Sequence, residues 1–346
     1  MNPTEIRRRL NVLRSERKTV EQTWQSIEQL VVPFRGKFFR EQSSEHEVDF
    51  RNSQLYDSTA IVACDGLSAA MQGSLTSPAT KWFGLQFNLA ELNKMIEPRA
   101  WLEECENIMF DTLQQSNFNI ESSEFYIDIT SFGTAFMSEE PVGEGSSFTG
   151  LDFSAVPVRE GFFETDHKDQ VKRFYRRLMW TPVQIIDKFG KENVPDTIKE
   201  KANNATQEKQ EVIFATYERP NVRPAEGVVE PRARPFGYRY VLAREATPLG
   251  TEGGYYEQPV FCGRWRKVSG SQWGHSPAFI AMPDIHNINE LVETTLEAAG
   301  KVIDPATLTT QRGLVSDLDL RRGGLTVVKN IGDLAPFDPG SRFDVA

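Results

Sequence analysis

The residues that most often carry catalysis or bind metals are few and widely spaced in this sequence. The four histidines share no metal-ligand spacing; they are His46, His167, His275 and His286. The three cysteines form no Cys-x-x-Cys pair; they are Cys64, Cys105 and Cys262. We therefore predict no metal site, and we expect reduced thiols rather than a disulfide framework.

The motifs that bind nucleotides or activate a nucleophile are also missing from the sequence. No Gly-x-x-x-x-Gly-Lys-Ser/Thr stretch occurs, which argues against a P-loop nucleotide site. The segment 66–70 (GLSAA) continues a predicted helix, whereas a hydrolase nucleophile elbow needs a strand, a turn and a helix. Asp317 and Asp319 are explained by alternation along a predicted strand. We predict no catalytic residue, no cofactor and no enzymatic activity.

The composition is that of a globular protein with an acidic surface. The 346 residues are 39% hydrophobic and 25% charged, and the formal net charge is -10. Because nucleic-acid affinity depends mainly on neutralising phosphates, the average surface should repel DNA. No apolar run approaches the roughly 20 residues that a membrane span needs, and no secretory signal follows the N-terminus. We expect assembly in the cytoplasm of the producing cell, without membrane contact.

The first predicted element is an amphipathic helix over residues 4–31. Apolar side chains recur at helical steps; they are Ile6, Leu10, Leu13, Val20, Trp24, Ile27 and Val31. Basic side chains decorate its exposed sides; they are Arg7, Arg8, Arg9, Arg14, Arg17 and Lys18. Since acidic residues are interleaved with them, we interpret this face as solvated rather than as a nucleic-acid or membrane site.

Two further helices are predicted before residue 120. The helix over 58–75, capped by Asp57 and Ser58, is slim because it is rich in alanine and glycine, which suits close packing between subunits. The helix over 97–116 is predicted to bury one side; its members are Trp101, Leu102, Cys105, Ile108, Met109 and Leu113.

A long helix over residues 276–304 is the most prominent element of the sequence. Ser276 and Pro277 start it, Pro305 ends it, and Pro283 is predicted to interrupt it before Asp284 caps it again. Its apolar stripe is predicted to pack on a partner; the residues are Ile288, Leu291, Val292, Leu296 and Ala299. An acidic face is a candidate channel or stem lining; it consists of Glu290, Glu293 and Glu297.

Short strands are predicted through the middle of the chain, and Thr181-Pro182 is predicted to start a short helix that ends at Gly190. The strands cover 81–87, 133–140, several pieces of 141–175, 212–220, 237–245 and 258–268, with a glycine-rich turn over 247–256 and a hairpin around 321–324. The stretch 236–273 combines aromatic strands with arginines that we expect to be exposed, a mixture enriched at protein interfaces. Its candidate interface residues are Arg239, Arg244, Arg264, Trp265 and Arg266.

Several ordered segments together resemble a known family. These are the W-x-x-I-E-x-L-V-V-P motif from Trp24 to Pro33, residues 57–85, residues 176–190 and residues 273–299. They resemble the head-to-tail connector, or portal, proteins of short-tailed bacteriophages, and the resemblance covers about residues 20–330.

The resemblance implies an α+β portal fold with an α/β wing, a helical stem and a small β-rich clip. Residues 1–220 would be the wing with a first stem segment, 221–275 the clip, and 276–304 the stem helix. Residues 305–346 would begin the returning wing or tunnel-loop region. Because no crown follows in this sequence, we expect a truncated form.

The resemblance also implies a structural function in the virion, at one capsid vertex. Such proteins form homo-oligomeric rings, typically of twelve subunits, through which double-stranded DNA passes without specific binding. The implied partners are the terminase large subunit, capsid and scaffolding proteins, and tail adaptor proteins. Two alternatives stay open from the residues alone: another phage ring protein such as a tail adaptor, or a hydrolase whose residues are dispersed.

Overall fold

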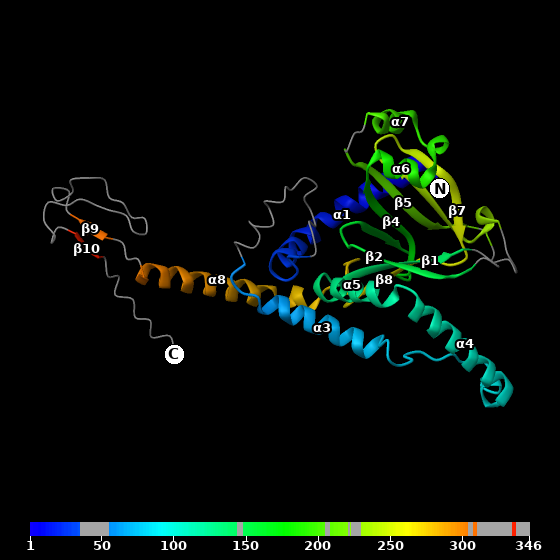
Figure 1. Cartoon of the computed structure of the whole chain (residues 1–346), viewed down its shortest axis with the longest axis horizontal. Helices are drawn as coiled ribbons and strands as arrows, with labels where there is room; N and C mark the ends of the chain where they lie inside the picture. Colours follow the sequence, from blue (N-terminus) through cyan, green and yellow to red (C-terminus); the bar gives the residue numbers. More distant parts are fainter. Residues whose placement is uncertain are drawn as a thin grey trace. The chain divides into compact units, whose positions relative to one another are not determined.

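The computed structural model describes residues 1–34, 55–143, 148–204, 208–220, 222 and 230–303, together with the backbone of 307–309 and 334–336. By its internal contacts the chain divides into two units. The larger unit comprises Met1–Asn52 and Ser58–Met282, and the smaller comprises Ser53–Asp57 and Pro283–Ala346. Helices and sheets both contribute, as the α+β prediction requires (Figure 1).

An antiparallel sheet in the order β3-β4-β5-β6-β7 forms the centre of the larger unit. Its strands are β3 (Gly161–Thr165), β4 (Val171–Trp180), β5 (Gln210–Glu218), β6 (Phe236–Leu242) and β7 (Thr247–Tyr255). Side chains alternate between its faces, because neighbouring residues of a strand point to opposite sides. Along β5, Ile213 and Ala215 join one core cluster, while Val212 and Phe214 join another.

Helices cover both faces of this sheet. The predicted first helix is confirmed as α1 (Pro3–Leu30), and its Ile6, Leu10 and Leu13 pack in the cluster that holds Ile213. The opposite cluster includes Ile185 of α6 (Pro182–Phe189) and Ile198 of α7 (Asp196–Asn203). α6 starts with a capping box formed by Thr181 and Gln184, in agreement with the predicted start.

A smaller antiparallel sheet in the order β2-β1-β8 completes the larger unit. It is formed by β1 (Thr134–Val142), β2 (Gly150–Val156) and β8 (Val260–Arg264). On one face, Phe136 of β1 contacts the aromatic rings of Phe163, Phe174 and Trp273. α5 (Phe118–Ser131) covers the other face, where a Cβ added to Gly263 would collide with Phe125 of that helix.

Two helices and their connections complete the first third of the chain. α3 (Thr59–Leu75) and α4 (Ile96–Gln115) lie where helices were predicted, and α4 projects away from the two sheets (Figure 1). Short 3-10 turns occupy Leu92–Lys94, Lys191–Asn193 and Pro231–Ala233. Ser58 precedes α3 as its N-cap residue, but its side chain makes no cap hydrogen bond.

One strand prediction and one turn prediction are wrong. Residues 81–87 form no strand, because their N–H groups bond to side chains: Leu85 donates to Glu106 and Phe87 donates to Asn93. The predicted turn over 247–256 is instead mostly strand β7. Its glycines let it lie against bulky neighbours, since Gly253 leaves room for the ring of Tyr238.

The boundary predicted near residue 220 does not separate two units in this structure. β5 precedes that boundary and β6 follows it, yet the two strands pair from Val212–Leu242 to Glu218–Phe236. β8 pairs with β1, which ends at Val142, well before residue 220 in the chain. Residues 221–275 therefore belong to the larger unit, because their backbone bonds are made with earlier strands.

The long helix is confirmed as α8 (Pro277–Ile303), but its predicted interruption is wrong. The Ser276 hydroxyl accepts the N–H of Phe279 at 2.9 Å and so caps the start. Pro283 lies inside the helix. It lacks one backbone N–H donor, but the helix continues on both sides of it. The division between the two units falls between Met282 and Pro283.

In the smaller unit, a two-stranded pair follows α8. β9 (Thr307–Thr309) pairs with β10 (Leu334–Pro336), from Thr307–Pro336 to Thr309–Leu334. The hairpin predicted around 321–324 and the carboxylates at 317 and 319 lie outside the described residues.

Arg17 corrects the prediction that all basic residues of the first helix are solvated. Its side chain is buried, and the residue is only 4% exposed. Its guanidinium donates to the carbonyls of Val158, Arg159 and Gly161 at 3.0–3.1 Å, and it pairs with Glu21 at 2.7 Å. Burial lowers the pKa of Arg17 to about 10, although Glu21 opposes this change.

Candidate functional site

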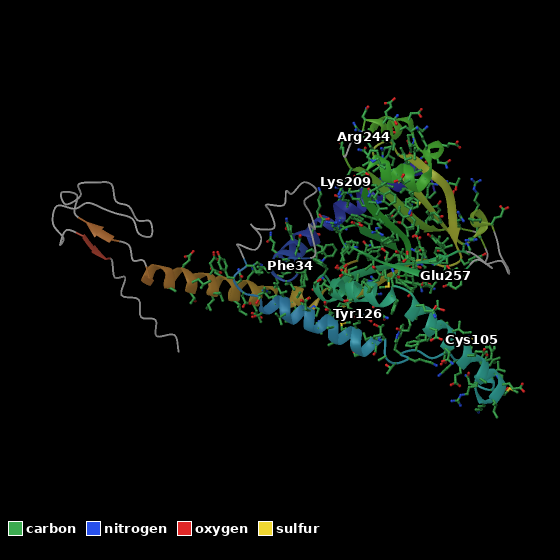
Figure 2. All side chains as sticks on the ribbon, in the orientation of Figure 1. Phe34, Cys105, Tyr126, Lys209, Arg244 and Glu257 are labelled. Atoms are coloured by element: carbon green, nitrogen blue, oxygen red, sulfur yellow. The ribbon has the colours of Figure 1, made fainter. Side chains whose placement is uncertain are left out.

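The most unusual surface of the larger unit lies on α4. No residue of this helix is buried, although its apolar side chains were predicted to form a buried side. Trp101 is 58% exposed and Ile108 is 60% exposed. Seven residues apart, they share one face of the helix, together with the half-buried Cys105. Figure 2 shows side chains on all sides of α4, with Cys105 labelled.

α3 leaves several of its large apolar side chains exposed. Its buried residues are Cys64 and Ser68, and Cys64 lies 3.5 Å from the Thr130 hydroxyl of α5. Leu67 is 36% exposed, and Leu75 is 53% exposed. Polar contacts to α5 are made by Cys64 and by Gln72, whose side chain donates to the carbonyl of Asn119 at 2.7 Å.

The predicted stem residues lie on the part of α8 that belongs to the smaller unit. Of the apolar stripe, Leu291 is 67% exposed and Leu296 is 57% exposed, and Ile288 is exposed as well. Val292 and Ala299 are intermediate in exposure. Large exposed apolar groups on one helix mark a surface that is suited to a partner.

The acidic face of α8 is also accessible. Glu290 and Glu297 are exposed, and Glu293 is half-buried. A hydrogen bond to Glu293 raises the pKa of Tyr56. The Asn289 side chain accepts the backbone N–H groups of Tyr56 and Asp57 at 2.8 and 3.2 Å, so this acidic turn is also where the segment before α3 is held.

The five residues predicted as a clip interface differ in their ion pairs and in their exposure. Arg239 pairs with Glu252 at 2.5 Å, and Arg264 pairs with Asp169 at 2.9 Å with its side chain only 8% exposed. The expected exposure is therefore wrong for Arg264, because its guanidinium is bound within the larger unit. Arg244, Trp265 and Arg266 are exposed.

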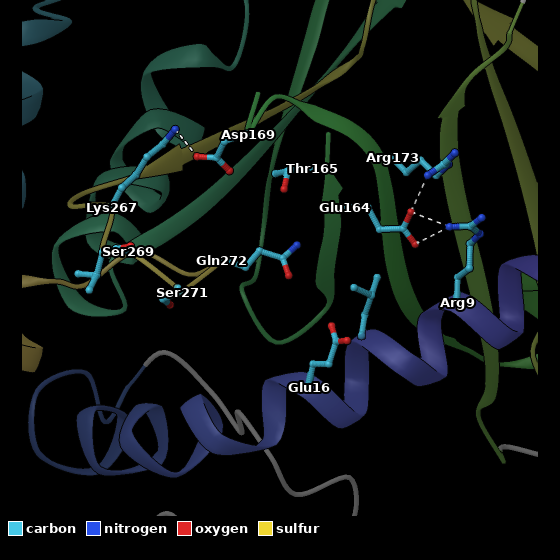
Figure 3. Close-up of a pocket in the computed structure, with 13 residues that line it drawn as sticks. Arg9, Glu16, Glu164, Thr165, Asp169, Arg173, Lys267, Ser269, Ser271 and Gln272 are labelled. Atoms are coloured by element: carbon cyan, nitrogen blue, oxygen red, sulfur yellow. Dashed lines mark hydrogen bonds and ion pairs between the residues drawn. The ribbon is translucent and has the colours of Figure 1, made fainter. Parts of the chain in front are cut away.

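An open pocket of about 760 Å³ lies between α1, β3, β4 and the loop after β8 (Figure 3). Arg9 and Arg173 both bind Glu164, at 3.0 and 2.7 Å. Asp169 accepts Arg264 and Lys267, which lower the pKa of Asp169 to about 2. These charges neutralise one another. We therefore interpret the ion pairs around the pocket as structural contacts that join α1 to the sheets, rather than as a catalytic centre.

Neither metal ligation nor membrane insertion is indicated by the described part of the chain. Within it, no group of three or more His, Cys, Asp or Glu side chains is placed to hold a metal ion. None of the described helices is long and apolar enough to cross a membrane.

These features are those of one class of protein, a structural subunit. Large apolar side chains stand on the outside of α3, α4 and α8, while the ionic clusters described above hold the larger unit together. Such a surface is typical of a structural subunit that assembles with other chains. The sequence analysis identified the apolar stripe of α4 but assigned it to the core. The acidic residues interleaved along α4 were the signal that could have indicated an exposed helix.

The comparisons with known proteins identify the family. The profile of the family described as "Bacteriophage head to tail connecting protein" matches residues 3–344, so the chain belongs to this family. A protein named "Probable portal protein" from Bordetella phage BPP-1 is 28% identical over 283 residues, covering 80% of this chain and 49% of that protein. The "Portal protein" of Salmonella phage epsilon15 is 23% identical over 302 residues, covering 87% of this chain and 52% of that protein. The chain thus spans about half the length of these curated relatives.

Proposed function

We propose that this chain is a portal subunit that assembles into a closed ring at one capsid vertex. The observation that carries the proposal is the exposure of Trp101, Ile108, Leu291 and Leu296 on two helices, in a member of the head-to-tail connecting family. A ring buries such faces because each subunit presents one surface to each neighbour. The subunits meet without disulfides, since Cys64 is buried and both Cys105 and Cys262 are only partly exposed.

The ring provides a passage for double-stranded DNA during packaging and ejection. The acidic balance of the chain supports this role, because a formal net charge of -10 disfavours tight binding to phosphates. Residues 1–220 act as wing and first stem segment, 221–275 carry the clip surface within the same unit, and 276–304 form the stem. The terminase large subunit docks first and tail adaptors later, while capsid and scaffolding proteins surround the ring in the virion.

Native mass spectrometry of the purified chain, with and without reducing agent, tests the assembly. We expect one closed oligomer of about twelve copies that survives reduction, because closed rings rather than open chains are the stable outcome of head-to-tail contacts. A species that stays monomeric or dimeric at high concentration would refute the ring. Dissociation by the reducing agent would instead show that cysteines join the subunits.

A further inference from the structure

One face of the three-stranded sheet is only partly covered by α5. Antiparallel partners point to the same side, so Met137, Phe261, Glu139 and Pro141 share the face that Gly263 presents to α5. Met137 is buried there, whereas Phe261 is 53% exposed. A groove of about 380 Å³ occupies the uncovered end of this face.

The walls of the groove are mainly aromatic and apolar. They include Pro141, Leu151 and Phe261 from the sheet, and Phe148 and Tyr256 from the flanking connections. Phe148 is 47% exposed and Tyr256 is 43% exposed. Rings that are open on one face attract organic cations as well as apolar groups.

Two carboxylates give the groove its accessible charge. Glu139 is half-buried, and Glu257, which is labelled in Figure 2, is exposed. Neither forms an ion pair within the part of the chain that the structure describes. Burial, and then the like charge of Glu257, raises the pKa of Glu139, as expected for a carboxylate that lacks a cation. Arg234 also lines the groove, but it is buried, donates to the carbonyl of Gly254 and lies 4.7 Å from the ring of Tyr256.

We propose that this groove binds a basic segment of a second protein, in which a lysine or arginine lies beside apolar side chains. The cation would sit between Glu139 and Glu257, and its apolar neighbours would contact Phe148 and Phe261. Charge complementarity and apolar burial then act together, since each carboxylate gains a partner as the rings lose water.

A second copy of this chain is the less suitable occupant. Its exposed apolar helix α4 carries Glu97, Glu103 and Glu104 around Trp101, so it would bring acids to an acidic groove. The formal net charge of -10 per chain adds long-range repulsion between copies, whereas a basic partner is attracted. The inference does not depend on ring formation, so it can fail or hold independently of the proposed function.

Binding of labelled synthetic peptides to the full chain, measured by fluorescence anisotropy, tests the proposal. One peptide alternates leucine, phenylalanine and lysine; matched peptides carry glutamate in place of lysine, or serine in place of the apolar residues. We expect saturable binding of the lysine peptide alone. The variant Glu139→Gln should weaken it by about tenfold or more, since a half-buried charge pair is lost.

Two further variants make the result specific. Glu192→Gln changes the net charge equally but lies outside the groove, so it should leave lysine-peptide binding unchanged. The double variant Glu139→Lys with Glu257→Lys should reverse the preference towards the glutamate peptide. Thermal unfolding of each variant checks that the chain remains folded.

Three outcomes would overturn the proposal. Equal binding of the lysine and glutamate peptides would show that the groove does not select charge. Full binding by a folded Glu139→Gln variant would remove Glu139 from the site. Lysine-peptide binding that is lost as the chain self-associates at rising concentration would identify a second copy, rather than a basic partner, as the occupant.

Discussion

Arg17 connects the first helix to a segment of the chain, residues 158–161, that lies far from it in sequence. Its guanidinium satisfies the carbonyls of Val158, Arg159 and Gly161, and its Cζ lies 3.7 Å from the centre of the Phe162 ring. A buried cation costs solvation energy, so this arrangement is stable only while its partners remain in place.

Replacing Arg17 tests this link directly. Arg17→Met should lower the free energy of unfolding by roughly 2–4 kcal/mol, because buried carbonyls lose their donors. Urea unfolding followed by circular dichroism measures the change. Arg8→Met, at an exposed position of the same helix, should stay within about 0.5 kcal/mol. Equal effects at both positions would contradict the role assigned to Arg17.

Arg264 and Arg266 are neighbours in sequence with different surroundings. Arg264 is held by Asp169, whereas Arg266 is exposed. We therefore expect Arg266→Ala to weaken binding of the terminase large subunit in a pull-down while the unfolding free energy stays nearly constant. Arg264→Ala should chiefly reduce stability, by roughly 1–3 kcal/mol, because a charged hydrogen-bonded pair is broken. Unchanged terminase binding by Arg266→Ala would count against the clip assignment.

At the scale of elements, α4 and α8 have apolar faces that are largely exposed in the described chain. Had Leu291 and Leu296 been packed in a core, replacing either with alanine should have cost roughly 2–5 kcal/mol. Both side chains are exposed, and an exposed side chain contributes little to the folding of the single chain. We therefore expect these substitutions to weaken assembly rather than to lower the stability of the single chain.

Charge substitution on α4 separates folding from assembly. Trp101→Glu combined with Ile108→Glu should leave helicity and the unfolding free energy within about 1 kcal/mol of the original chain, because both sites are exposed. The ring should be lost in sedimentation velocity, since the new charges would be buried between subunits. Glu103→Gln, about opposite Trp101 on the helix, is the matched control and should assemble. Rings that form normally with both glutamates would exclude α4 from the interface.

At the scale of the whole molecule, the proposed passage of DNA has to be compatible with an acidic protein. Glu290, Glu293 and Glu297 repeat along one helix, and a ring would multiply them around its axis. If this face lines the channel, its charge lowers the affinity of the wall for phosphates.

Reversing that charge should convert passage into retention. Rings in which all three glutamates are changed to lysine should retain duplex DNA at low salt, with retention falling steeply as salt rises. Filter binding over a salt series measures this, with the original ring as control, and packaging should fail although rings still form. Triple-lysine rings that bind no more DNA than the original would place this face on the outside of the stem.

The sequence by itself determined the elements whose signals are local. Apolar periodicity located α1, α4 and α8, and the residues Thr181 and Ser276 marked two helix starts, because caps and stripes depend on residues only a few positions apart. The ordered segments from Trp24 to residue 299 carried enough of the family pattern to indicate a portal protein, which the family match over residues 3–344 bears out.

Only the tertiary structure decided which faces are buried and which strands pair. Arg17 reads as a solvated cation in sequence, yet carbonyls more than 140 positions away enclose it. Trp101 reads as core, yet it is 58% exposed, and β6 joins β5 across the expected boundary near residue 220. The physical reason is the same in each case: burial and strand pairing are set by contacts between distant segments, about which local periodicity carries no information.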